Sequence, residues 1–521
     1  FEKIDPLVDN REEAKQILWA DYDNDGDPDL LVAGHWGINR LYENKGDLKM
    51  EEVTEAAGLP MEVHGAYGAC WGDYNRDGWL DLLCNYRNYD SNNNRGGNRL
   101  FKNNADGTFS EVTEFAKTGN DNRLPFQSTF FDYNNDQWPD IHTANDKLTF
   151  NTLYENLGNG TFFDVSELTK ANARMNSMCS NTADMNNDGW TDIYVTNTPV
   201  GSQLLLNQGA FTDPLEIVFD EVAEELGVTY KGGTGWAANF FDADNDGDLD
   251  LYVSGSGIDP IIKGVHFYEN IDLQYFEVIK DGFEKDTTPS FTNAVADFNL
   301  DGRLDIMVQN NAPFDFNLWE NNTVNDHHWI KLKLEGVLSN RDGIGTRIES
   351  YAQALYQQQY THCGYGFLGQ NSATKHIGLA NHERVDSLVI TWSSGHIDRL
   401  YNLGVNQILT IKEGMSTDGT IYTAPNVRIV NRPVITNVED FEANLNWTIS
   451  PNPADDWLFV QSEIPLVEVV VVDAVGRELL VRHSQSGTDF SIPIPTFSKG
   501  VYLIKVLNKR GFWQVQKWIK Q

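Results

Sequence analysis

The chain has 521 residues, 12% of them aromatic and 43 of them glycine, and its formal net charge is -37. This length predicts two to four domains, and the composition favours an all-β protein with many tight turns. The charge argues against nucleic acid as a partner, because nucleic acid attracts basic surfaces. We also expect no membrane insertion, since no run of about 18 apolar residues occurs and the chain opens on Phe1 and a charged segment.

A nine-residue, aspartate-rich loop recurs six times, starting at residues 21, 73, 132, 184, 242 and 297. A short β-rich run follows each loop, and a second mark such as LYEN then ends in asparagine, at Asn44, Asn103, Asn156, Asn207, Asn270 and Asn321. A third mark, F-x-x-[VI] or a variant, precedes most loops, as at Phe1 and Phe109. The period of about 55 residues fits the four-stranded blade of a β-propeller. We expect six blades, or seven if the chain start and the region after Asn321 pair to close the ring.

The loops have the chemistry of calcium sites. Calcium takes six to eight oxygen ligands, and acidic or amide side chains at positions 1, 3, 5 and 9, with the backbone carbonyl of position 7, supply them around a turn. Glycine at position 6 permits the left-handed turn. The predicted ligands are Asp21, Asp23, Asp25, Asp27, Asp29, Asp73, Asn75, Asp77, Trp79, Asp81, Asp132, Asn134, Asp136, Trp138, Asp140, Asp184, Asn186, Asp188, Trp190, Asp192, Asp242, Asp244, Asp246, Asp248, Asp250, Asp297, Asn299, Asp301, Arg303 and Asp305.

Position 12 separates these loops from helical EF-hand and dockerin loops, which need an acidic residue there. This chain has Val, Cys or Thr at that position, so we expect the loops to join strands. Residues 1–325 therefore resemble the FG-GAP or VCBS repeats of integrin-α-like propellers, with about six Ca²⁺ sites. The five aspartates of loops one and five predict the tightest sites. Gln137 replaces the glycine of loop three, at a cost of about 1 kcal/mol, and predicts the weakest site.

Two of the four cysteines, Cys70 and Cys84, lie symmetrically outside the second loop. If that loop joins two antiparallel strands, the two thiols face each other and can form a disulfide in an oxidising compartment. Two buried free thiols are the alternative.

The repeat ends after Asn321, and alternating segments such as HHWIKLKLEG at 327–336 and VDSLVITWSSG at 385–395 predict strands. With IGTRI at 344–348 and HIGLA at 376–380, residues 326–414 resemble the UnbV/ASPIC domain that accompanies such propellers in cartilage-acidic-protein-like sequences. Residues 415–445 carry turn formers and no repeat, and are interpreted as a linker.

Residues 446–521 contain ISPNPADDWLFV, then VEVVVVDAVGRELL and a final KGVYLIKVLNKRGFWQVQKWIKQ. This order resembles the type A C-terminal sorting domain of the type IX secretion system. The resemblance implies recognition by the type IX translocon and an outer-membrane barrel shuttle, and a location at the cell surface or outside a Gram-negative bacterium.

The sequence contains no GxSxG elbow, HExxH helix, P-loop or GxGxxG motif, so we expect a binding or adhesion protein with an unidentified glycan or protein ligand on the propeller. Two alternatives stay open: a propeller-based polysaccharide lyase or other glycan-active enzyme, and a subunit of a surface filament or layer. A glycan site would be lined by the polar loop at 85–99 and by His35, Trp36 and Trp236, although a solvated loop is the simpler interpretation.

Overall fold

The computed structural model describes residues 14–35, 37–63, 65–87, 96–120, 123–209, 218–257, 265–279, 282–283, 286, 288–415, 447–450, 457–472, 478–493, 500–508 and 513–520. The chain is all-β; in the described ranges, α1 (Thr113–Ala116) is the one helix, and none is long and apolar enough to cross a membrane. It divides into two compact units. The first is Phe1–Gly209 with Ile217–Pro433, and the second is Ala210–Glu216 with Val434–Gln521.

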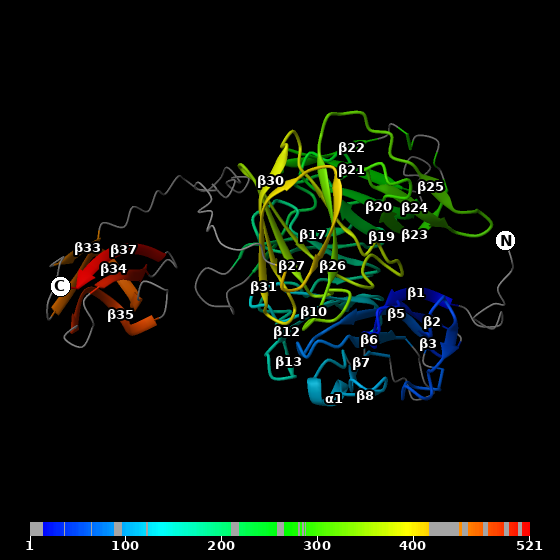
Figure 1. Ribbon diagram of the computed structural model, residues 1–521, viewed down its shortest axis with the longest axis horizontal. Coiled ribbons are helices and arrows are strands. Elements are labelled where there is room, and N and C mark those ends of the chain that lie inside the picture. The colour runs from blue at the N-terminus through cyan, green and yellow to red at the C-terminus, as the bar shows by residue number, and fades with distance from the viewer. Residues whose placement is uncertain are drawn as a thin grey trace. The chain divides into compact units, whose positions relative to one another are not determined.

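Six antiparallel sheets carry the six loops (Figure 1, blue to green). The first five sheets are β1 (Ala14–Ala20), β2 (Asp29–Gly34), β3 (Arg40–Asn44), β4 (Met50–Glu52); β5 (Ala66–Gly72), β6 (Asp81–Tyr86), β7 (Asn98–Asn103), β8 (Phe109–Glu111); β9 (Pro125–Phe131), β10 (Asp140–Asn145), β12 (Thr152–Asn156), β13 (Phe162–Asp164); β15 (Ser180–Ala183), β16 (Asp192–Val195), β17 (Gln203–Asn207), β18 (Phe219–Glu221); and β19 (Gly233–Phe241), β20 (Asp250–Gly257), β21 (His266–Ile271), β22 (Tyr275–Ile279). The sixth has β23 (Ser290–Ala296), β24 (Asp305–Asn310) and β25 (Asn317–Trp319). Between the third and fourth sheets, β11 (Thr149–Phe150) pairs with β14 (Arg174–Met175).

Each loop joins the first strand of its sheet to the second, as its non-acidic position 12 predicted. The first strand of each sheet also packs against the first strand of the next, from β1 to β23. Repeated four-stranded sheets placed side by side in this way are the arrangement of a propeller. The number of blades stays a prediction, because the expected closing partner at Phe1 lies outside the described residues.

The asparagine that ends the second mark fastens neighbouring sheets together. Its side-chain amide donates to a carbonyl of its own loop and, in five sheets, to the position-2 carbonyl of the preceding loop. The bonds between sheets, 2.6–3.3 Å long, run from Asn103, Asn156, Asn207, Asn270 and Asn321 to Tyr22, Tyr74, Tyr133, Met185 and Ala243. This sequence mark therefore has an architectural role, because each bond satisfies a backbone acceptor between sheets, and four of the five bonds are buried.

Residues 326–415 form two further sheets within the first unit. One has the order β29 (Lys375–Gly378), β26 (Trp329–Glu335), β32 (Gln407–Lys412), and the other β28 (Leu355–Tyr360), β27 (Arg347–Ala352), β30 (Arg384–Thr391), β31 (Ile397–Gly404). Strand β26 is parallel to β32. Their apolar faces enclose a core around Ile330, Leu388 and Trp392.

Residues 361–374, here called the axial loop, leave this region and run among the first strands of the propeller. Phe367 at its tip is 0% exposed and shares one core cluster with Phe126 and Trp236. Earlier in the loop, the carbonyl of Cys363 accepts a 3.1 Å hydrogen bond from the Trp71 N–H. The core of the propeller is thus completed by a segment from outside the repeats.

The axial loop also bridges the sixth and first sheets. On the sixth sheet, Thr292 donates to the Phe367 carbonyl over 2.6 Å and the Val295 N–H donates to Asn371 over 2.9 Å. On the first sheet, Gln370 exchanges hydrogen bonds of 2.7 and 2.8 Å with the backbone of Trp19. The loop therefore ties together the first and last sheets of the repeat array.

The second unit is a separate sheet of strands β33 (Trp447–Ser450), β34 (Trp457–Val472), β35 (Glu478–Pro493), β36 (Gly500–Asn508) and β37 (Trp513–Lys520). Their order is β33-β34-β36-β37, and β35 also pairs with β34. Val460, Val471 and Ile504 are fully buried, so this unit has its own apolar core. The predicted linker at 415–445 lies almost entirely outside the described residues.

The predicted disulfide between Cys70 and Cys84 is wrong. All four cysteines are free and buried. In the β5–β6 register, Cys70 faces Leu83 and Cys84 faces Ala69, so the two thiols point to opposite faces of the sheet. Cys70 packs beside Phe130, whereas the Cys84 thiol lies 3.4 Å from the Asn39 amide.

Candidate functional site

All six loops share one backbone frame. The N–H of position 6 donates to the position-1 carboxylate over 2.8–3.1 Å in every loop. The position-9 carboxylate accepts one bond from the N–H of position 2 and another from the N–H of the asparagine that ends the second mark. Each carboxylate oxygen keeps a further lone pair, so these bonds orient the oxygens and leave them able to hold a cation.

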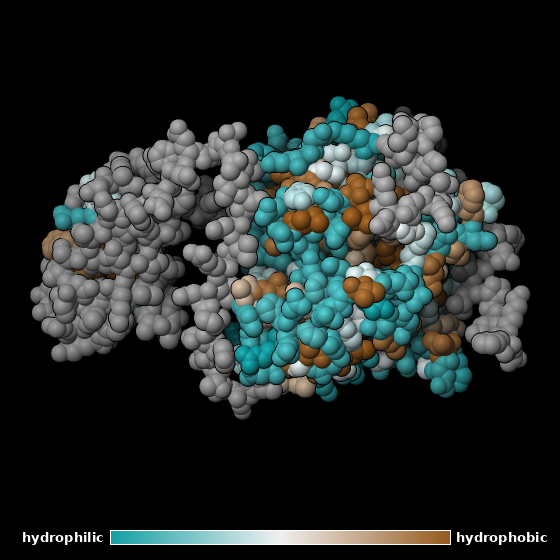
Figure 2. Space-filling view, turned by 90° about the horizontal axis from the view of Figure 1, so that it is seen from above, coloured by the Kyte–Doolittle hydropathy of each residue, from teal (hydrophilic) through white to brown (hydrophobic). Residues whose placement is uncertain are grey.

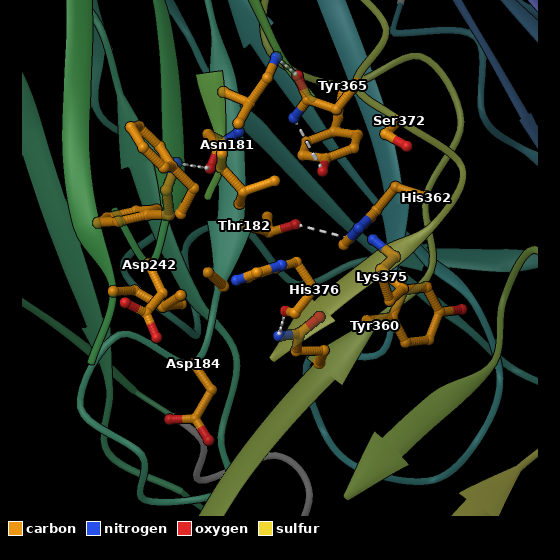
Figure 3. A pocket seen from close by; sticks show the side chains of 18 of the residues that line it. Asn181, Thr182, Asp184, Asp242, Tyr360, His362, Tyr365, Ser372, Lys375 and His376 are labelled. Carbon is orange, nitrogen blue, oxygen red and sulfur yellow. Dashed lines mark hydrogen bonds between the residues drawn. The ribbon is translucent and has the colours of Figure 1, made fainter. Parts of the chain in front are cut away.

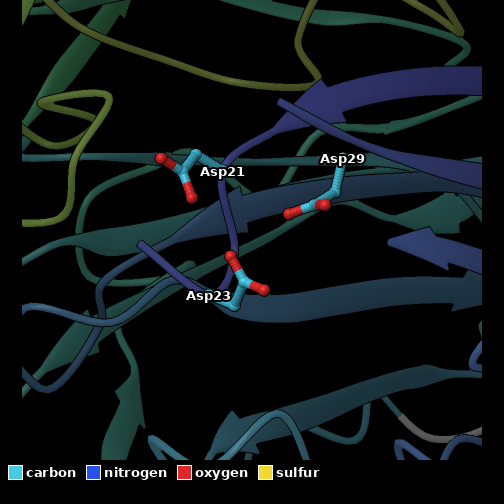
Figure 4. Close-up of side chains that lie close together, drawn as sticks. All are labelled: Asp21, Asp23 and Asp29. Carbon is cyan, nitrogen blue, oxygen red and sulfur yellow. The ribbon is translucent and has the colours of Figure 1, made fainter. Parts of the chain in front are cut away.

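Loops one and five each bring three carboxylates within reach of a single cation. Asp21, Asp23 and Asp29 offer oxygens within 4.8 Å of one another, and Asp242, Asp244 and Asp250 do the same. Figure 4 shows the three carboxylates of loop one converging on one point. In loop five, Oδ1 of Asp242 and of Asp248 are buried without a hydrogen-bond partner. Buried, converging and unpaired carboxylate oxygens fit a hard cation such as calcium.

The ionisation of these carboxylates is unfavourable without a cation. Burial and the neighbouring carboxylates raise the pKa of Asp21 to about 7, and burial raises that of Asp29 to about 8. In loop five, burial followed by its neighbour Asp246 raises the pKa of Asp244 to about 6 and that of Asp248 to about 10. A bound cation would remove this penalty by compensating the charge.

Without calcium, the first unit is expected to become less stable as the pH rises from about 5 to about 8. The pKa values of Asp21, Asp29 and Asp73 are higher in the folded protein than the ordinary 3.8, so the folded state binds more protons than the unfolded chain. The stability present at low pH is therefore lost as pH passes through about 7 to 8. Thermal unfolding of the chelated protein at pH 5, 6.5 and 8 measures this, and a midpoint that rises with pH contradicts it.

Loops two, three and four have three carboxylates and an asparagine at position 3. That asparagine donates a hydrogen bond to the position-5 carboxylate and accepts one from the position-5 N–H. In loop three these bonds join Asn134 and Asp136 and are 3.0 and 3.1 Å long. Gln137 of loop three adopts a left-handed φ of 72°, where the other loops have glycine. Its predicted backbone strain is thus present, while the ranking of calcium affinities stays a prediction.

Loop six is different, because two basic side chains already contact its carboxylates. Lys331 forms an ion pair with Asp297, and Arg303 forms one with Asp301. The predicted ligands of this loop do not fit a further divalent cation in the way those of loops one and five do.

A small pocket lies between loops four and five, the axial loop itself and the two strands that flank that loop, β28 and β29. Figure 3 shows Thr182 facing His362, with a 3.0 Å contact between Oγ1 and Nε2, and the carboxylates of Asp184 and Asp242 at one end. Burial lowers the pKa of both His362 and His376, so both imidazoles are neutral. The cavity measures about 100 Å³, which holds about three waters and is too small for a sugar.

Two larger hollows, of about 400 and 340 Å³, share Trp79 in their walls. The first also has Asp23, Glu43 and Asp106, and the second reaches Arg341 and Lys412. Volumes above about 300 Å³ are typical of ligand pockets. Figure 2 shows one face of the molecule, on which apolar residues form scattered patches among hydrophilic ones.

The tryptophans at position 7 of loops two, three and four are all half-buried, but the residue beside the ring differs between their sheets. The corresponding tryptophans Trp138 and Trp190 pack on Gly158 and Gly209, where a Cβ would lie only 2.9 and 2.8 Å from the indole. Ala105 occupies that place in the second sheet and lines the first hollow. A glycine therefore lies beside the ring in the third and fourth sheets, whereas Ala105 and two hollows adjoin the half-buried Trp79 in the second sheet.

The glycan site predicted at His35, Trp36 and Trp236 is only partly described, because Trp36 and residues 88–95 of the polar loop lie outside the described ranges. Trp236 packs against the rings of Phe291 and Phe367, with centroids 4.9 and 5.6 Å apart, and His35 packs on Tyr67. These described rings therefore contribute to packing around the axial loop.

Family models match three parts of the chain. The FG-GAP-like repeat matches residues 21–84, 91–143, 132–195 and 184–253, the ASPIC and UnbV model matches 336–418, and the secretion system C-terminal sorting domain matches 448–521. These matches confirm the three resemblances predicted from the sequence. The sorting-domain match indicates export by the type IX system to the cell surface or the extracellular space.

The chain is also similar to solved structures at low identity. A lectin from Agrocybe aegerita that recognises terminal N-acetylglucosamine is 18% identical over 60% of this chain and 81% of its own, with a TM-score of 0.36. An exo-β-1,3-galactanase from Phanerochaete chrysosporium is 9% identical over 75% of this chain and 94% of its own, with a TM-score of 0.29. A GH32 β-fructofuranosidase from Bombyx mori is 12% identical over 76% of this chain and 91% of its own, also with a TM-score of 0.29. No curated protein matches the chain. Likenesses this distant carry no argument about function.

Proposed function

We propose that this exported chain, with its FG-GAP-like repeats, is a calcium-stabilised binding protein of the cell exterior whose ligand is a glycan held at Trp79. The observation that carries the proposal is the position of the half-buried Trp79 indole, which lines two hollows of ligand size. A single ring with open space beside it on two sides fits a chain of linked sugars better than one small molecule.

The chemistry of the first hollow suits a neutral sugar. The negative face of an indole attracts the weakly positive C–H groups of a pyranose ring. Asp23, Glu43 and Asp106 supply carboxylate oxygens that accept hydrogen bonds from sugar hydroxyls. An anionic sugar would gain no charge attraction at this end, since the hollow is lined by acidic groups and no basic one.

Binding is favoured over catalysis by the surroundings of the available nucleophiles. In the described part of the chain, His142 Nδ1 lies 2.7 Å from Ser180 Oγ, a pairing of base and hydroxyl, yet both side chains are 0% exposed. Burial also lowers the pKa of His142 to about 3. This pair lines none of the pockets described above, and we infer that it stabilises the interior.

The test is glycan binding by Trp79→Ala, expected to fall at least tenfold from wild type, with Trp79→Phe keeping part of the affinity. The matched control is Phe115→Ala, which removes another ring, 65% exposed, and should leave binding unchanged. Bound calcium is counted in parallel, because position 7 contributes only its backbone carbonyl. If Trp79→Ala binds glycan as well as wild type does, the proposed site is refuted. If the protein captures other proteins but no glycan, the proposed ligand class is refuted. If unsaturated sugar products appear, the protein is a lyase instead.

A further inference from the structure

Loop six contains two basic side chains among the carboxylates that the repeat devotes to calcium. The Lys331 ammonium, from β26 outside the repeats, pairs with Oδ2 of Asp297 at position 1. The Arg303 guanidinium, at position 7 of the loop itself, pairs with Asp301 at position 5. Both carboxylates belong to positions that would ligate a metal, so each is already neutralised within the protein.

The lysine is held firmly in place. Its side chain is 5% exposed, and its ammonium lies 4.9 Å from the centre of the Trp329 ring, within cation–π range. The Trp329 indole in turn covers Gly302 of loop six, where a Cβ would overlap the ring at 1.9 Å. A calcium ion could enter only if this buried ammonium moved into surroundings without a partner charge, which is costly.

The position-1 aspartates show the contrast with the other loops. Burial raises the pKa of Asp21 and Asp73 to about 7 and that of Asp132 to about 6. It also raises the pKa of Asp184 and Asp242 well above the ordinary value. At Asp297 burial is the largest single influence and acts in the same direction, but the hydrogen bond and charge of Lys331, with the N–H groups of Gly302 and Asp301, together lower the pKa. The position-1 carboxylate of loop six is thus already compensated by a buried cation, whereas the pKa of the position-1 carboxylate is raised in each of loops one to five.

We propose that Lys331 is the built-in cation of loop six: with Arg303 it takes the place of a calcium ion, so this loop binds no metal and fastens residues 326–415 to the sixth sheet without calcium. The predicted number of calcium sites falls from six to five. The contact between loop six and residues 326–415 therefore differs from the calcium loops in one respect. Its cation is a side chain of the protein, so a chelator cannot remove it.

The experiment counts calcium per chain in the full 521-residue protein, by elemental analysis after gel filtration at a fixed free calcium concentration. Asp242→Asn in loop five is the reference and should lose one calcium ion. Asp297→Asn changes the same position of loop six and should lose none. A loss of one ion by Asp297→Asn overturns the proposal.

A second pair of variants tests the lysine directly. Lys331→Met combined with Arg303→Ala frees the carboxylates of loop six and is expected to gain one calcium ion relative to wild type. Lys333→Met, two residues along the same strand and exposed, is the matched control and should leave the count unchanged. No gain by the double variant, in a protein that melts cooperatively in calcium, overturns the replacement by Lys331. If the double variant fails to fold, the Asp297→Asn comparison decides alone.

Discussion

An excess of chelator is expected to lower the thermal unfolding midpoint of the first unit by at least about 10 °C. Binding to the folded state alone stabilises by about 2.7 kcal/mol per site when calcium is at a hundred times its dissociation constant. Loops one and five together then contribute about 5 kcal/mol. The midpoint shift per kcal/mol falls with size, to about 1 °C in a unit of about 430 residues, so two sites give about 5 °C and all five loops about 10–15 °C.

The control is the same chelator already saturated with calcium, which should leave the midpoint where it was. Asp21→Asn and Asp242→Asn, each in calcium, should reproduce part of the loss, because they remove one charge from the two carboxylate clusters. Restoring calcium should restore the midpoint. An unchanged melt in excess free chelator would show that the acidic loops hold their shape without metal.

The repeats could be predicted well because their signals are local. Six phased loops, each followed by a β-rich run and an asparagine, specify hairpins within about 55 residues of chain. The bonding partners of the asparagines could not be read from the sequence, since they lie on the preceding sheet, as from Asn103 to Tyr22. Periodicity identifies the element, while the partner depends on how the sheets pack.

The disulfide prediction failed for a reason of register. Cys70 and Cys84 are each three residues from the loop's outer aspartates, which suggests a symmetric pair. However, β5 ends at Gly72 and pairs it with Asp81, so the hairpin is centred half a residue away from the loop. A shift of one residue turns a facing pair into residues on opposite faces.

Lys331 and the axial loop could not have been found from the sequence. In the alternating segment IKLKL, Lys331 and Lys333 occupy equivalent positions, yet Lys331 is 4% exposed and Lys333 is exposed. Its partner Asp297 is 34 residues away, and Gln127, which accepts from the N–H of Phe367, is 240 residues away. Such contacts depend on where the 326–415 region docks, and no local pattern encodes that.

Phe367→Ala is expected to destabilise the first unit by about 3–5 kcal/mol, because a fully buried aromatic side chain is removed from a packed core. Its ring lies 5.3–5.6 Å from those of Phe126, Trp236 and Phe291, which come from three different propeller sheets. Loss of this ring should also loosen the axial loop, and with it the bridge between the sixth and first sheets.

Denaturant unfolding in saturating calcium measures the stability, with Phe163→Ala as the control. That phenylalanine is 51% exposed on β13, and its removal should change stability by no more than about 0.5 kcal/mol. Hydrogen exchange then locates the effect: the N–H groups of Trp19 and Val295, which donate to Gln370 and Asn371 of the axial loop, should lose protection before those inside the second sheet. Equal loss of protection in all sheets would mean that the axial loop fills space without joining the first and last sheets. An unchanged free energy of unfolding would mean that the propeller core does not depend on the Phe367 ring.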